Sequence, residues 1–240
     1  MKYAYNGKKG DGYMKKTINA AVKASIPVMM GYLVLGIAFG MLLESKGYGL
    51  IYALLMSVFV YAGSMQFVAI NLLTSGATLI SAAIMTLLIN ARHMVYGLSM
   101  IKKFDGMGSL KPYMIFSLTD ETYSLLVGSK APEGCNEKYY LFFISFFDQC
   151  YWIIGSVIGS LIGSMITINT TGLDFAMTAL FVVIVLEQFL TSKKHIYTYI
   201  GFIISIICLF IFGSQSFIIP SIIVIVMSLL AMYQGGKENA

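Results

Sequence analysis

The chain has 240 residues, of which 58% are apolar and only 11% charged, and its formal net charge is +5. Soluble domains carry about 25% charged residues, so the composition excludes an ordinary soluble protein and predicts an all-α membrane protein. The basic residues form no face with interleaved aromatic side chains, which argues against nucleic-acid binding.

The N-terminal region is basic. Lysines at positions 2, 8, 9, 15, 16 and 23 precede the first apolar stretch, which runs from Ile26 to Leu43. Lysine and arginine favour the cytoplasmic side of a membrane and its anionic lipids, so we expect a cytoplasmic N-terminus against a lipid bilayer. The predicted organisation is a basic segment at 1–16, a single transmembrane permease domain at 17–234 and a short tail at 235–240.

The apolar runs predict a polytopic bundle of seven or eight transmembrane helices, because about 20 residues are needed for each crossing. The predicted helices cover 25–43, 49–73, 77–101, 112–128, 139–166, 172–190, 196–213 and 216–234. Eight crossings would place Lys102, Lys103 and Lys111 outside, against the usual charge bias. One re-entrant or broken segment would reduce the number to seven, and the two models stay open.

The run at 49–73 contains Gly63, Ser64 and Gln66 near its middle. Glycine and serine pairs are recognised sites of helix kinks, so we predict a broken helix near Gly63. The backbone groups freed by a break bind ions and zwitterions in many transporters. The alternative is an ordinary kink whose polar side chains bind a neighbouring helix.

The next run contains Asn90, Arg92 and His93. On a regular helix Asn90 and His93 lie about 60° apart, whereas Arg92 points about 160° away from Asn90. These residues are candidates for a substrate or proton pathway. A static ion pair or an interfacial position of Arg92 is the alternative.

Asp120 and Glu121 follow in the predicted helix 112–128. We expect one of these carboxylates to pair with Arg92 across two helices, because an unpaired buried charge is strongly unfavourable. Such a carboxylate could also load and release a proton. The alternative is that this segment lies at the interface and both acids face water.

The second half contains two further acidic candidates, Asp148 and Asp174; a helix-capping role is the main alternative for Asp174. Small residues favour close helix packing, and Gly36, Gly40, Gly155, Gly159 and Gly163 form such faces. These faces could pack within the chain or against a separate membrane subunit. The correspondence of Gly36 and Gly40 with Gly159 and Gly163 also indicates a possible internal repeat.

No residues favour an enzyme. There is no nucleophile-elbow or ATP-binding motif, and the three cysteines have no metal-binding spacing, so we predict neither catalytic residues nor a metal or other cofactor.

Four strings together resemble one known family, the AzlC proteins. They are Tyr61-Ala-Gly-Ser-Met-Gln-Phe67, Leu88-Ile-Asn-Ala-Arg-His-Met-Val-Tyr96, Leu118-Thr-Asp-Glu-Thr122 and Gly172-Leu-Asp-Phe-Ala-Met-Thr-Ala-Leu180. The resemblance covers about residues 17–232. It implies the large subunit of a bacterial inner-membrane exporter of branched-chain amino acids, assembled with a small AzlD-type membrane subunit and driven by the proton gradient.

A leucine-sized substrate side chain needs an apolar recess, for which Phe59, Met65 and Met94 are candidates. Two other functions remain open at this point. One is a channel or small-solute pore, and the other is a membrane scaffold that transports nothing.

Overall fold

The structure, a computed structural model, describes residues 7–166, 195–213 and 217–238, together with residues 175, 179, 182, 185, 186, 189 and 190. The chain divides into two compact units, Met1–Thr178 and Ala179–Ala240. All regular structure in the described residues is helical, which confirms the all-α part of the predicted class.

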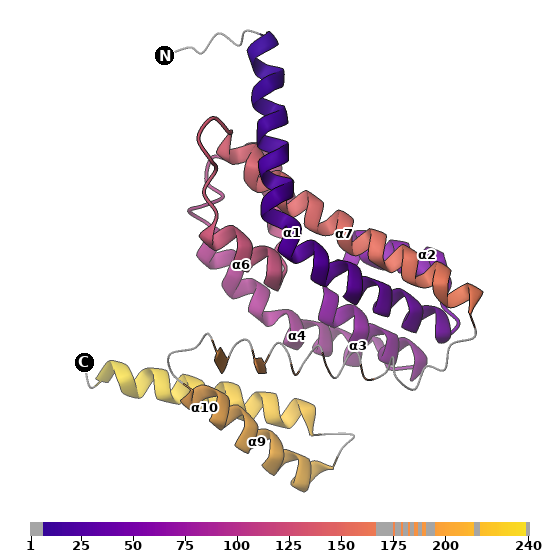
Figure 1. Cartoon of the computed structure of the whole chain (residues 1–240). Helices are drawn as coiled ribbons and strands as arrows, with labels where there is room; N and C mark the ends of the chain where they lie inside the picture. Colours follow the sequence, from indigo (N-terminus) through magenta and orange to yellow (C-terminus); the bar gives the residue numbers. More distant parts are fainter. Residues whose placement is uncertain are drawn as a thin grey trace. The chain divides into compact units, whose positions relative to one another are not determined.

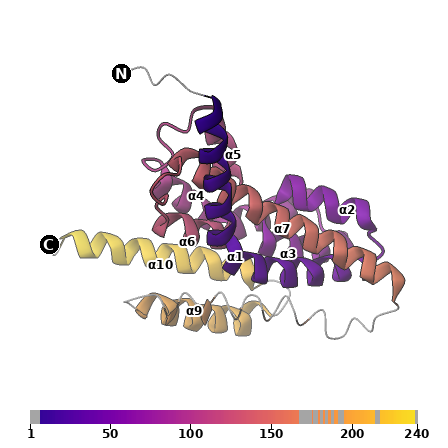
Figure 2. The same ribbon diagram turned by 45° about the horizontal axis from the view of Figure 1, so that its top comes forward.

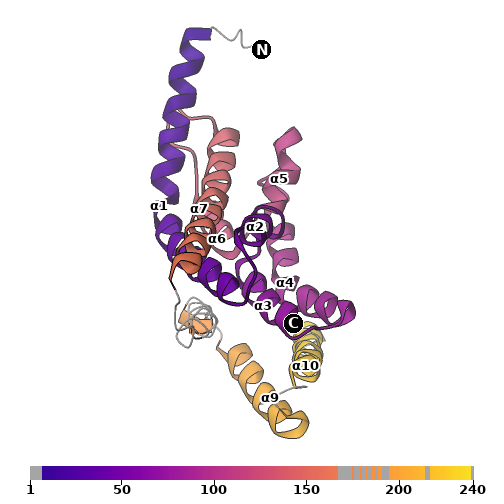
Figure 3. The same ribbon diagram turned by 90° about the vertical axis from the view of Figure 1, so that its right-hand side faces the viewer.

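The first unit is built around two long helices, α1 (Gly7–Ser45) and α7 (Glu137–Met165), which lie side by side (Figures 1 and 3). Between them in sequence come α2 (Leu50–Leu55), the π-helix η1 (Met56–Val60), α3 (Gly63–Thr74), α4 (Leu79–Met100), the 3₁₀ turn η2 (Gly108–Leu110), α5 (Lys111–Phe116) and α6 (Asp120–Gly128). Figure 2 shows α2 lying along α7.

The second unit contains α9 (Ile196–Phe212) and α10 (Ile218–Glu238), which pack against each other. Within the described residues, the segments long and apolar enough to cross a membrane are Gly12–Ser45, Leu79–Met100 and Glu137–Met165. Shorter apolar helices cover Leu50–Val60, Ile196–Phe212 and Ile223–Met232. Seven or eight crossings and an internal repeat stay predictions.

The glycines of α1 and α7 lie against each other. A Cβ placed on Gly40 would be 2.1 Å from the carbonyl oxygen of Ser156, and one placed on Gly159 would be 2.1 Å from that of Ile37. Gly36 likewise has the Cα of Gly155 within 3.1 Å of its ideal Cβ position. The two backbones therefore touch without intervening side chains, and these glycine faces serve packing inside the chain.

The break predicted near Gly63 is present, and it falls two residues earlier. The π-helix η1 ends at Val60, Tyr61 adopts a left-handed backbone conformation (φ 39°, ψ 51°), Ala62 is non-helical, and α3 begins at Gly63. A left-handed conformation costs a non-glycine residue roughly 1–2 kcal/mol. Tyr61 is only 3% exposed, so the packing of its ring holds the backbone in this conformation.

The single helix predicted over 112–128 is wrong, because the structure divides it at 117–119 into α5 and α6. Thr119 has an extended backbone, and its hydroxyl accepts a hydrogen bond from the Thr122 amide at 3.3 Å. A threonine in this position starts a helix by satisfying one of the first free amides. The break places Asp120 and Glu121 in the first turn of α6.

Candidate functional site

The guanidinium of Arg92, on α4, joins two other helices. Its Nη2 lies 2.8 Å from Asp120 Oδ2 at the start of α6 and donates a 2.6 Å hydrogen bond to Ser64 Oγ at the start of α3. The predicted link between Arg92 and a carboxylate on the next helices is therefore present, and it goes to Asp120. Gly63 precedes Ser64 and lies against the indole of Trp152.

Two polar atoms of this ion pair, and a third on α4, are buried and make no hydrogen bond. They are Arg92 Nε, Asp120 Oδ1 and Asn90 Oδ1. An unsatisfied buried polar group costs about 1–3 kcal/mol, so such groups need an explanation. Arg92 Nε and Asp120 Oδ1, one donor and one acceptor of the ion pair itself, offer hydrogen-bonding capacity to a small polar ligand.

The backbone at the start of α3 adds to this capacity. The first backbone N–H of α3 with an α-helical hydrogen bond is that of Gln66, which donates to the Ala62 carbonyl at 2.8 Å. No side chain caps the start of the helix. The amides before Gln66 therefore lack intrahelical partners, and the positive end of the helix dipole lies beside Ser64.

A second polar network runs through the buried interface of α1, α6 and α7. The Tyr32 hydroxyl donates to Glu121 Oε2 at 2.9 Å and lies 2.5 Å from Thr119 Oγ1. Thr119 Oγ1 lies 3.0 Å from Thr122 Oγ1, which in turn lies 2.8 Å from Asp148 Oδ2. Glu121 and Asp148 are thus connected through three hydroxyl groups. Asp148 is fully buried, and its Oδ1 makes no hydrogen bond.

Gln66 is fully buried and faces α7 rather than the ion pair. Its side-chain carbonyl accepts a 2.9 Å hydrogen bond from the indole nitrogen of Trp152. On the same face of α7, Gln149 donates to the Val58 carbonyl of the π-helix at 3.1 Å and accepts from Tyr113 at 2.7 Å. These contacts fix both sides of the helix break to α7.

The remaining candidate residues take no part in the hydrogen bonds described above. His93 stacks edge-on against Tyr96, with ring centroids 5.8 Å apart. Phe59 and Met94 are 71% and 59% exposed and Met65 is buried, and their role in an apolar recess for the substrate stays a prediction. Asp174 lies outside the described residues.

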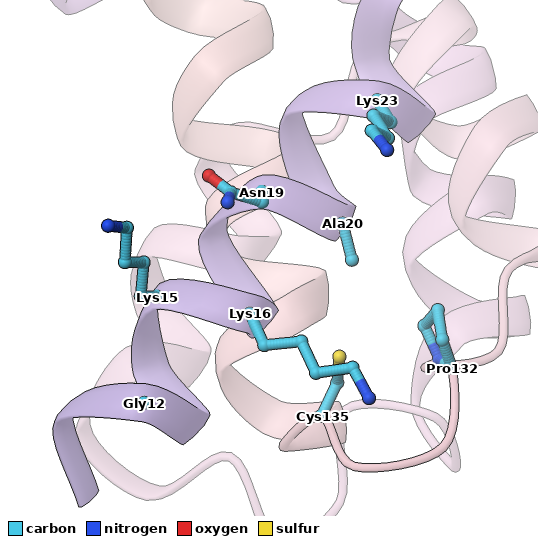
Figure 4. A pocket seen from close by; sticks show the side chains of 8 residues that line it. All are labelled: Gly12, Lys15, Lys16, Asn19, Ala20, Lys23, Pro132 and Cys135. Carbon is cyan, nitrogen blue, oxygen red and sulfur yellow. The ribbon is translucent and has the colours of Figure 1, made fainter.

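A separate pocket of about 630 Å³ lies at the N-terminal end of α1 (Figure 4). Its lining is basic, and comprises Gly12, Lys15, Lys16, Asn19, Ala20, Lys23, Pro132 and Cys135. Lys16 extends toward Pro132 and Cys135 in Figure 4 and donates a 2.8 Å hydrogen bond to the Glu133 carbonyl. Lys23 lies nine residues before Tyr32, a helical rise of roughly 14 Å, so this pocket is distinct from the polar networks.

The sequence reasoning missed Tyr32, Thr119, Thr122 and Trp152. A signal existed for the threonines, because a threonine followed by two acidic residues and a second threonine is typical of a capped helix start. Tyr32 gave no such signal, since a single tyrosine in an apolar helix has no characteristic pattern.

A broken helix beside a half-buried ion pair, within a bundle of apolar helices, is typical of membrane transport proteins. The chain belongs to the AzlC family: the family model described as AzlC protein matches residues 27–166. No solved structure matches the chain.

Three relatives illustrate this membership. The branched-chain amino acid transport protein AzlC of Bacillus subtilis is 41% identical over 92% of this chain and 87% of its own length. An uncharacterized membrane protein of Helicobacter pylori is 41% identical over 90% of this chain and 94% of its own length. The inner membrane protein YgaZ of Escherichia coli is 26% identical over 59% of each chain. These relatives support a transport role in a membrane.

Proposed function

We propose that this chain is the large subunit of a secondary transporter that exports branched-chain or similarly sized apolar amino acids across the bacterial inner membrane. Its relationship to the Bacillus subtilis protein supports the substrate class. The observation that carries the proposal is that Arg92 and Asp120 form an ion pair while Arg92 Nε and Asp120 Oδ1 stay buried and unpartnered.

A free amino acid is a zwitterion, and each of its charges needs a partner inside an apolar protein. Arg92 Nε and the first amides of α3 are donors suited to the substrate carboxylate. Asp120 Oδ1 and Asn90 Oδ1 are acceptors suited to the substrate ammonium group. Without substrate, Arg92 and Asp120 would thus stay paired with each other. A bound substrate would separate them, with its carboxylate at Arg92 and its ammonium group at Asp120.

Proton coupling is part of the proposal. The chain has no P-loop motif, and buried carboxyl groups lie next to the proposed substrate site at Glu121 and, through hydroxyl groups, at Asp148. Inward movement of a proton could drive outward movement of an uncharged or zwitterionic substrate.

A small AzlD-type membrane subunit is the proposed partner. The glycine faces of α1 and α7 contact each other, so the partner would bind another surface. The outer face of α4 is a candidate, because Leu79, Leu87 and Leu98 are 89%, 62% and 69% exposed. The N-terminus and its basic pocket would lie in the cytoplasm, where lysines are favoured.

The test is transport by the full chain, with and without the small subunit, in proteoliposomes. We expect saturable leucine, isoleucine or valine counterflow, and efflux that accelerates with a proton gradient. Arg92→Gln and Asp120→Asn should each abolish counterflow, whereas Lys102→Gln, an exposed cation just beyond α4, should leave it unchanged.

Other outcomes distinguish the competing functions. Flux that rises linearly with concentration and shows no counterflow would indicate a pore. Unchanged flux of all substrates relative to empty vesicles, with the subunits still bound to each other, would indicate a scaffold.

A further inference from the structure

We propose that Glu121 and Asp148 share one proton, which moves between them along the hydroxyl groups of Tyr32, Thr119 and Thr122. The proposal rests on the proposed transport function only for its role in coupling. The relay itself follows from the hydrogen-bond geometry of the described residues.

The number of hydrogen atoms in this network determines how many carboxyl protons it holds. Four contacts join the two carboxyl groups: Glu121 to Tyr32, Tyr32 to Thr119, Thr119 to Thr122, and Thr122 to Asp148. Each contact needs one hydrogen, but the three hydroxyl groups supply only three. If both carboxyl groups were ionised, one oxygen–oxygen contact would contain no hydrogen. If both were protonated, there would be one hydrogen too many.

A single carboxyl proton satisfies all four contacts, and it does so in either of two ways. With the proton on Asp148, every hydroxyl donates toward Glu121; with the proton on Glu121, every hydroxyl donates toward Asp148. Thr119 Oγ1 also accepts the Thr122 amide hydrogen, and its two lone pairs and one hydrogen suffice in both arrangements.

The transfer between the two arrangements is balanced. The Asp148 proton passes from Oδ2 to Thr122 Oγ1, the Thr122 hydroxyl hydrogen passes to Thr119, and that of Thr119 passes to Tyr32. The Tyr32 hydrogen then passes to Glu121 Oε2. The three hydroxyl groups end neutral, and one carboxyl group has lost the proton that the other gained.

The electrostatic surroundings of the two carboxyl groups also favour one retained proton. The described titratable groups facing Asp148 are Tyr32, Tyr61, Tyr113 and Glu121, so no cation offsets its charge. Two carboxyl groups in one buried site do not readily ionise together.

The described titratable groups that face Glu121 are Asp120, Tyr32, Tyr61, Asp148 and Arg92. The Arg92 guanidinium contacts Asp120 and Ser64 instead, so its nearest carboxylate is not part of the relay. One retained proton therefore removes a buried charge that no salt bridge compensates.

The decisive experiment is infrared difference spectroscopy of the purified full chain in lipid vesicles, which detects the carbonyl stretch of a protonated carboxyl group during a pH titration. An amide places an N–H donor where the shared proton would lie. We therefore expect that either Asp148→Asn or Glu121→Gln removes the same single band. Glu44→Gln is the matched control, since Glu44 accepts from Ser160 outside this network, and it should keep the band.

Persistence of the band in either of the two network variants would overturn the shared proton. This measurement needs no transport, so it decides the relay even if wild-type vesicles show no amino-acid counterflow and the proposed function fails.

The coupling role is tested on Thr122. Thr122→Val keeps the side-chain volume but removes the hydroxyl, so gradient-driven efflux should be lost while amino-acid counterflow continues. Thr122→Ser should restore gradient-driven efflux. Normal gradient-driven efflux by Thr122→Val would overturn the relay as the coupling path.

Discussion

The indole N–H of Trp152 donates a 2.9 Å hydrogen bond to the side-chain carbonyl of Gln66, and both side chains are buried. This bond joins the middle of α7 to the first turn of α3, next to the helix break. Edge-to-face contact between Trp152 and Tyr32, with centroids 5.4 Å apart, extends the same interface to α1.

Trp152→Phe should lower the free energy of unfolding by about 1–3 kcal/mol, because Gln66 Oε1 would remain buried without a donor. Thermal unfolding in detergent measures the effect. The double variant Trp152→Phe with Gln66→Met removes both polar partners and should recover part of the loss. If the two substitutions lowered the free energy of unfolding additively, the hydrogen bond between Trp152 and Gln66 would contribute nothing to stability.

Gly40→Ala should sharply reduce membrane abundance and thermal stability. The new methyl group would meet the Ser156 carbonyl at 2.1 Å, so α1 and α7 would have to separate. Gly31→Ala is the matched control on the same helix: nothing lies within 4 Å of its Cβ position, and alanine is a better helix former. Equal stability of the two variants would contradict direct backbone contact between the helices.

Arg92→Gln should reduce the abundance of folded protein, because Asp120 would lose its cationic partner. Adding Asp120→Asn should restore abundance, since a neutral pair needs no counter-charge, but transport should remain absent. Abundance is measured by fluorescence-detected gel filtration. Recovered transport in the double variant would show that the ion pair is purely structural.

Lys103 closes the C-terminal end of α6. Its ammonium group donates to the carbonyl oxygens of Leu126, Val127 and Ser129, the last at 2.8 Å. Cations at this end of a helix are favourable. Lys103→Met should therefore increase amide hydrogen exchange over 126–130, whereas Lys102→Met, whose side chain is exposed, should not.

Burial lowers the pKa of Lys103, Glu137 acts in the opposite direction and Lys130 lowers it further. Between this lowered pKa and the unfolded value of about 10.4, the unfolded chain binds more protons, so this group makes stability rise with pH. The gain in folding stability from the titration of Lys103 is fully present above the pKa of the unfolded chain, and it is lost as pH falls through the pKa of the folded protein. Melting temperatures measured across alkaline pH should lose this slope in Lys103→Met.

Sequence reasoning predicted the helical class, the break near Gly63 and the pairing of Arg92 with a carboxylate, since each follows from residue type or charge. It did not predict Tyr61 as the left-handed residue at the break, because this backbone conformation depends on tertiary packing of the Tyr61 ring. It also treated 112–128 as one helix, although the Thr119 hydroxyl starts a new helix there.

The relay was beyond reach of the sequence for a different reason. Tyr32 and Asp148 lie on helices far apart in the chain, and only the close approach of α1 to α7 brings both of them to α6. Glu121 and Asp148 were predicted individually as candidate acids, but their connection depends on three hydroxyl groups that no sequence pattern indicates.

The contact between the glycines of α1 and α7 has a mechanical consequence. With backbone against backbone, we expect α1 and α7 to move together, and these helices carry Tyr32 and Asp148, whereas Glu121, Thr119 and Thr122 lie at the start of α6. Three of the four hydrogen-bond contacts therefore cross the interface between α6 and the pair of α1 and α7. A displacement of α6 by little more than the length of one hydrogen bond would break all three hydrogen bonds together. Such a movement would disconnect Glu121 from Asp148 and stop proton transfer between them.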